Sequence, residues 1–154
     1  MPDNVADINK IIELPLDKLR SFDTVKEQFS DLGVLFDNAF VLQPSNATYF
    51  PEVGEMVLMG APRNGWIEIT FTIPINYFAC RLTSSQHTKV QAYDCDGESL
   101  ALFDTETADY KEADRLVSAP PPNLNVKIQA LNIERVTLNS LDGQLVIHDV
   151  CFGF

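Results

Sequence analysis

The chemistry that this sequence can support is stacking and hydrogen bonding. Aromatic rings offer apolar faces, while amide, guanidinium and imidazole groups offer planar hydrogen-bonding groups. Six side chains of these kinds fall in or beside predicted loops: Arg63, Asn64, Trp66, Gln86, His87 and Tyr110. Together they would form a shallow site for a ligand that has a flat apolar face and several hydroxyl groups.

Catalysis finds little support in the sequence. It contains no GxSxG elbow, HExxH pair, P-loop or GxGxxG turn. His148 alternates with Val146 and Val150 on the last predicted strand, which indicates a structural histidine. Because 22 acidic residues produce carboxylate pairs by chance, a glycoside hydrolase that uses an acid pair is the weakest interpretation. We therefore expect no enzyme activity and no required cofactor.

Composition narrows the partners and the compartment. The net charge of −11 argues against binding to nucleic acid or to an anionic membrane surface. No apolar run approaches the ~20 residues of a membrane-spanning helix. The first ten residues lack an apolar core, and the cysteine count is odd, so we expect a cytoplasmic protein, or an exported one if a signal was removed. The three cysteines are predicted to be small buried side chains: Cys80, Cys95 and Cys151.

Apolar and polar residues alternate with the period of β-strands along most of the chain. About nine short strands are expected, drawn from ten segments with this alternation: 11–16, 34–42, 54–60, 66–73, 78–83, 89–93, 98–103, 124–130, 133–140 and 145–152. One short helix is predicted at 24–30, because Thr24 and Glu27 have the spacing of a capping box. Many short strands at this spacing predict an antiparallel sandwich or barrel.

Three stretches resemble a known class of domains. They are QFSDLGVLF at 28–36, GWIEITFTIP at 65–74 with VQAYDCDG at 90–97, and IERVTL at 133–138 with IHDVCFG at 147–153. In this order they resemble the galactose-binding-like jelly-roll domains of bacterial PEP-CTERM proteins, which are related in architecture to carbohydrate-binding modules. The resemblance covers roughly residues 20–154.

The resemblance implies an all-β, antiparallel jelly-roll sandwich that binds carbohydrate. A single domain over 1–154 is expected, with residues 1–10 as a flexible arm. Some jelly-roll carbohydrate modules hold a structural calcium ion between their first and last strands, and Glu13 and Asp149 match those places. Calcium is less expected at Asp94-x-Asp96-Gly97, because the twelfth position of such a loop is Thr105, and a hairpin turn explains that segment better.

Antiparallel connectivity groups the predicted loops into two ends. The loops at 61–65, 84–88, 104–123 and 141–144 would share one end, and those at 74–76, 95–97 and 131–132 the other. The first end would carry the six candidate ligand-binding residues. Two functions stay open: a carbohydrate-binding module, and a protein–protein or structural assembly module without a small-molecule site. The sequence leaves the oligomeric state undetermined.

Overall fold

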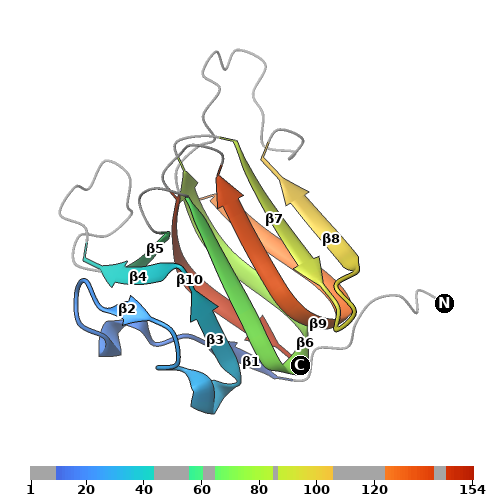
Figure 1. The fold of residues 1–154 in the computed structure, drawn as a ribbon, viewed down its shortest axis with the longest axis horizontal. Coiled ribbons are helices and arrows are strands. Elements are labelled where there is room, and N and C mark those ends of the chain that lie inside the picture. The colour runs from blue at the N-terminus through green and yellow to red at the C-terminus, as the bar shows by residue number, and fades with distance from the viewer. Residues whose placement is uncertain (1–9, 44–55, 61–64, 85–86, 106–123, 141–144) are drawn as a thin grey trace.

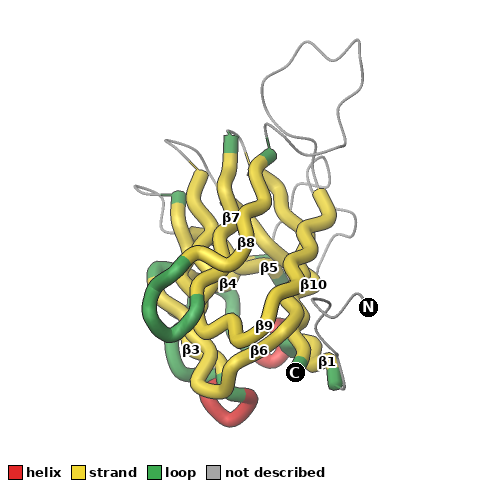
Figure 2. The backbone as a smooth tube through the Cα atoms, turned by 90° about the vertical axis from the view of Figure 1, so that its right-hand side faces the viewer, coloured by secondary structure: helices red, strands yellow, loops and turns green. Residues whose placement is uncertain are grey.

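The computed structural model describes residues 10–43, 56–60, 65–84, 87–105, 124–140 and 145–154. Within these ranges the regular structure is antiparallel strand, apart from two short 3-10 turns (Figure 2). The elements are β1 (Ile11–Glu13), η1 (Leu16–Lys18), β2 (Thr24–Val25), η2 (Ser30–Leu32), β3 (Val34–Asp37), β4 (Ala39–Leu42), β5 (Val57–Gly60), β6 (Trp66–Ser84), β7 (Thr88–Tyr93), β8 (Ser99–Asp104), β9 (Leu124–Ser140) and β10 (Leu145–Gly153). In the part described, no helix has the length and apolar character needed to cross a membrane.

Two long strands, β6 and β9, form the frame of the fold. They pair from Trp66 opposite Asn139 to Leu82 opposite Leu124, with shifts of register on both sides of Ile75. The two-stranded ribbon folds over at these shifts, so each half of it belongs to a different layer (Figure 1).

The two layers share β6 and β9. The first layer has the order β3–β6–β9–β7–β8 and uses the first half of β6 and the second half of β9. The second layer has the order β2–β4–β5–β10–β6–β9 and uses the other halves, with β1 paired to the last residues of β10. The result is an all-β antiparallel jelly-roll sandwich, as the sequence predicted.

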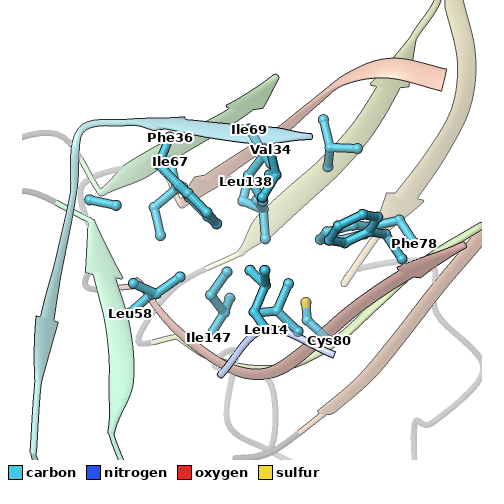
Figure 3. Close-up of a cluster of buried hydrophobic side chains, with 14 of the residues drawn as sticks. Leu14, Val34, Phe36, Leu58, Ile67, Ile69, Phe78, Cys80, Leu138 and Ile147 are labelled. Atoms are coloured by element: carbon cyan, nitrogen blue, oxygen red, sulfur yellow. The ribbon is translucent and has the colours of Figure 1, made fainter. Parts of the chain in front are cut away.

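The core fills the space between the layers. Alternation along each strand turns one set of apolar side chains inward. In Figure 3, the first layer contributes Val34, Phe36, Ile67, Ile69 and Leu138, which face Leu14, Leu58, Cys80 and Ile147. Most of these side chains are fully buried, and burial of each Val, Leu, Ile or Phe contributes about 1.5–3 kcal/mol.

Aromatic contacts close the core beside the bend in β6. The ring of Phe71 lies 6.4 Å from that of Phe78, although both belong to one strand, and 5.2 Å from that of Phe152 on β10. Such pairs contribute about 0.5–1.5 kcal/mol beyond the area that they bury. They therefore hold the two halves of β6 against each other.

The bend itself depends on two asparagines. Asn132 adopts a left-handed backbone conformation with a φ of 61°, and its amide N–H donates to the Oδ1 atom of Asn76, 3.1 Å away. Asparagine tolerates this conformation better than other residues that carry a side chain. The segments 74–76 and 131–132, predicted as loops, are thus bends within continuous strands.

The two predicted ends of the sandwich exist. Gly65 accepts a hydrogen bond from the amide of Ser140, Thr88 pairs with Ser140, and Ser84 pairs with Leu145. The described residues next to 61–64, 85–86, 106–123 and 141–144 therefore lie at one end. The bends and the β7–β8 hairpin lie at the other.

The predicted helix at 24–30 is wrong. Thr24 and Val25 form β2, with Val25 fully buried opposite Ala39. The side chain of Gln28 accepts from the amide of Lys26 and donates to the carbonyl of Thr24, which satisfies the turn locally. Side-chain bonds of this kind compete with helix formation.

The hairpin prediction at 94–97 is confirmed. The Oδ1 atom of Asp94 accepts from the amides of Asp96 and Glu98, and Gly97 has a φ of 80°. These bonds make the segment a turn between β7 and β8. The arm predicted for residues 1–10 lies, apart from Lys10, outside the described residues.

We predict that Asn132→Ala lowers the free energy of unfolding by about 1–2 kcal/mol, because alanine is strained in the left-handed conformation. Asn132→Gly should change it far less. Urea denaturation measures both values. Gln129→Ala, at an exposed position of the same strand, is the control and should stay within about 0.5 kcal/mol of the parent protein. Equal losses for the alanine and glycine variants would contradict this account of the bend.

Candidate functional site: a polar and aromatic sheet face

The outer face of the first layer carries polar and aromatic side chains in three rows across β6, β9 and β7. Because Ile67 and Ile69 point into the core, their neighbours on β6 point outward. The rows are Trp66–Asn139–Lys89, Glu68–Thr137–Gln91 and Thr70–Arg135–Tyr93. A hollow of about 440 Å³ lies on this face, lined by six of these side chains together with His87.

Several of these side chains are held in place by one another. The guanidinium of Arg135 lies 4.4 Å from the centre of the Tyr93 ring and 3.6 Å from the carboxylate of Glu68. The hydroxyl of Tyr93 donates to the Oε1 atom of Gln91 at 3.0 Å. This bond fixes the amide of Gln91, whose NH₂ group is then oriented as a donor.

The backbone of Trp66 is anchored at the edge of the hollow. Its carbonyl accepts a hydrogen bond from the side-chain amide of Asn38 at 2.8 Å. A Cβ atom on Gly60 would lie 2.9 Å from the same carbonyl oxygen, so β5 approaches β6 closely because this residue is glycine. Trp66 is partly exposed, as the polar phase of its strand predicted.

His87 lies beside this row, where it pairs through Nε2 with the carboxylate of Asp104. The amide of the next residue, Thr88, donates to the hydroxyl of Thr105, and the amide of Thr105 donates to the carbonyl of Thr88. These bonds tie the start of β7 to the end of β8. The imidazole is therefore fixed at the border of the hollow.

Of the six residues predicted from the sequence, the structure brings Trp66 and His87 together. Arg63, Asn64, Gln86 and Tyr110 lie outside the described residues. The sequence analysis missed the strand residues of the site: Lys89, Gln91, Tyr93, Thr137 and Asn139. Their signal was available, because each occupies the polar phase of a strand whose other phase is apolar.

The predicted metal residues line a second hollow, of about 700 Å³, on the outer face of the other layer. Glu13 lies opposite Cys151 in the β1–β10 pair. Asp149 lies in a bulge of β10, where its carboxylate is 3.4 Å from Nε of Arg81. Among the described residues no group of three or more His, Cys, Asp or Glu could hold a metal ion, and calcium binding stays a prediction.

His148 is buried beneath this bulge, with 2% of its surface exposed. Its Nδ1 atom lies 3.5 Å from the carboxylate of Asp149. Burial lowers the pKa of His148, and the positive charge of Arg81 adds to this, while Asp149 acts in the opposite direction. The imidazole is therefore neutral near pH 7, as expected for a structural histidine.

The three cysteines are free thiols in different environments. Cys80 is buried, and burial raises its pKa strongly. Cys151 is half-buried in the second hollow, and Cys95 is exposed in the hairpin turn, so the prediction of three buried thiols is wrong for Cys95. Burial and nearby carboxylates also raise the pKa of Cys151, which makes its thiol a poor nucleophile.

Comparison with known proteins finds similarity in solved structures. No family model matches the sequence, and no curated protein sequence matches it. A mutant of a family 29 carbohydrate-binding module, complexed with mannohexaose, aligns at a TM-score of 0.43 and 7% identity over 76% of this chain and 77% of that one. A family 61 module in complex with β-1,4-galactotriose aligns at 0.46 and 11% over 86% and 100%, respectively. A family 6 module aligns at 0.42 and 12% over 94% and 92%.

These structural neighbours are carbohydrate-binding modules with the jelly-roll fold, which is the relationship that the sequence motifs indicated. A link to PEP-CTERM proteins stays a prediction. At such TM-scores and identities the likeness is one of general architecture, so the function has to be argued from the site itself.

We predict that the buried imidazole makes stability depend on pH. The folded-state pKa of His148 lies below the unfolded value of about 6.5, so the unfolded state binds more protons between the two. The stability that the neutral imidazole contributes is fully present above the unfolded-state pKa of about 6.5, and it is lost as the pH falls toward the folded-state pKa. His148→Asn should therefore lose less stability than the parent protein between pH 7.5 and pH 5, measured by urea denaturation.

The control is Val146→Ala, which removes buried volume from the same strand without removing a titrating group. It should be less stable than the parent protein at both pH values, with the parent's pH dependence. If His148→Asn keeps that dependence in full, another group is responsible for the acid sensitivity.

Proposed function

We propose that this protein is a non-catalytic carbohydrate-binding module, with its site on the outer face of β6, β9 and β7 at the loop end of the sandwich. The observation that carries the proposal is the partly exposed Trp66 in one cross-strand row with Asn139 and Lys89. An indole presents a flat apolar surface to the C–H face of a sugar ring. The neighbouring amide and ammonium groups match its hydroxyl groups.

The geometry suits a ligand that is not charged. Two of the charged groups at this face already have partners, since the guanidinium of Arg135 is paired with Glu68 and the carboxylate of Asp104 with His87. The amides of Gln91 and Asn139 are neutral hydrogen-bonding groups. Hydroxyl groups of a neutral sugar can bond to such amides without the cost of desolvating an unpaired charge.

The site is also preorganised. Its side chains project from paired strands, and the Tyr93–Gln91 bond and the Arg135–Tyr93 stacking fix their orientations. Little conformational entropy is then lost on binding, which favours measurable affinity at a shallow surface. These contacts support binding rather than turnover.

Assembly is the alternative function. Among the described residues, five large apolar side chains are more than half exposed: Ile11, Phe22, Ile73, Leu102 and Leu131. They are spread over β1, the turn before β2, the bends of β6 and β9, and β8. An assembly module should elute as a stable oligomer, which size-exclusion chromatography tests independently of sugar binding.

We predict that Trp66→Ala weakens binding at least tenfold, the equivalent of about 1.4 kcal/mol, because the stacking surface is lost. Mannohexaose, cellulohexaose and β-1,4-galactotriose are suitable probes for isothermal titration calorimetry. Trp66 is the one tryptophan in the chain, so its fluorescence also reports binding in the parent protein. Tyr77→Ala, on the opposite layer, is the matched aromatic control and should bind as the parent does. If the parent protein binds none of these glycans, or if Trp66→Ala and Tyr77→Ala bind with equal affinity, the proposal is contradicted.

A second variant tests the preorganisation. Tyr93→Phe keeps the ring over which Arg135 lies but removes the hydroxyl that holds Gln91. We predict a severalfold loss of affinity for the glycan that the parent binds, with an unchanged melting temperature. The loss should be absent in a Gln91→Ala background, because the amide that the hydroxyl orients is already gone. An equal loss in both backgrounds would show that Tyr93 acts by another route.

A further inference from the structure

The second hollow is built on a cross-strand row that is separate from the proposed carbohydrate site. Glu13, Cys151, Ala79 and Lys127 are successive partners on β1, β10, β6 and β9. The two inner residues are small and form a floor, while the two outer residues carry opposite charges. Three strand spacings of about 4.8 Å separate Glu13 from Lys127, which is roughly 14 Å between Cα atoms.

Further charges extend each wall of the hollow. Asp149 and Asp17 lie with Glu13 on the side of β10, β1 and η1, while Arg81 lies with Lys127 on the side of β6 and β9. Cys151 and Ala79 lie between Glu13 and Lys127 in the row, and all four residues line the hollow. The charges of opposite sign therefore face the same floor.

The bulge in β10 positions the centre of the hollow. Asp149 has a φ of 50°, which is strained for a residue with a side chain, and the bulge brings its carboxylate to the guanidinium of Arg81. His148, buried and lining the hollow, contacts the same carboxylate. Arg81, His148 and Asp149 thus line the hollow as one connected group.

We propose that this hollow binds a small zwitterion, a free α-amino acid, with the ligand's ammonium at the Glu13–Asp149 wall and its carboxylate at the Lys127–Arg81 wall. The ammonium and carboxylate of an amino acid are about 3 Å apart, and with a hydrogen bond of about 2.8 Å at each end they span roughly 9 Å. For the ligand to bridge the two walls, the side chains of Glu13 and Lys127 have to lean inward over Cys151 and Ala79.

Charge distinguishes this ligand from the alternatives. Arg81 and Asp149 are already paired with each other, but a neutral sugar would supply no ionic partner for Glu13, Asp17 or Lys127, whereas a zwitterion supplies one for each wall. A free anion would be repelled by the net charge of −11, and a zwitterion carries no net charge. The hollow thus differs from the face at Trp66, where the amides of Gln91 and Asn139 are neutral hydrogen-bonding groups.

The test is a titration of the isotopically labelled full-length chain with L-alanine, followed by amide chemical shifts. We expect saturable shifts that centre on Ala79, Cys151 and Lys127. Alaninamide lacks the carboxylate and N-acetylalanine lacks the ammonium, so each should bind at least tenfold more weakly. Equal binding by either analogue, shifts centred elsewhere, or no saturable shift would overturn the proposal.

Variants separate this site from the proposed glycan site. Glu13→Gln and Lys127→Met, both at exposed positions, should each weaken alanine binding at least tenfold without lowering the melting temperature. Lys89→Met, the matched lysine variant on the other layer, should bind alanine as the parent does. Trp66→Ala should also keep alanine binding, so a failure of the carbohydrate proposal would leave this result readable. Unchanged affinity in Glu13→Gln and Lys127→Met would contradict the assignment.

Discussion

The rest of the structure depends on the folding-over of a single two-stranded ribbon. β6 and β9 pair along both of their halves, and the remaining strands add to one half or the other. Contacts between β6 and β9 therefore have to form between residues that are 42 positions apart at Leu82–Leu124 and 73 apart at Trp66–Asn139, before either sheet has its centre. The contacts among Phe71, Phe78 and Phe152 bury the inside of the bend. Pairings this far apart in the chain carry a large loop-closure entropy, which burial of the core has to exceed.

The bend also decides where ligands can bind. Each half of the ribbon turns its apolar phase inward, and its polar phase then faces solvent on opposite sides of the molecule. Trp66 and Arg81 lie on one strand, yet they serve different faces because the strand bends between them. Both hollows lie on paired strands, where side chains lose little freedom when a ligand arrives.

The alternation of residues was sufficient to predict most of the strands, the hairpin at Asp94 and the outward position of Trp66. It was insufficient at the bends, because Pro74 and Asn132 are also normal residues for loops, and the pairing that keeps the strands continuous is non-local. The prediction of a helix at 24–30 was wrong for a similar reason, since Val25 pairs with Ala39 on another strand. The site residues predicted from the sequence lay in or beside loops. Gln91 and Tyr93 lie instead in the polar phase of β7.

The bulge at Asp149 could not be predicted from the alternation of apolar and polar residues, because it changes which residues of β10 face inward. One extra residue in β10 moves Val150 and Phe152 into the core and leaves Asp149 outside the regular phase. Without that shift, Phe152 would face the same side as His148, and a phenyl ring would be exposed where the hollow now has its floor. The bulge therefore serves the core and the surface at once. The outer phase of each strand can change while the inner phase stays apolar, so the fold alone does not determine the ligand. What each face binds is decided by its own rows of side chains.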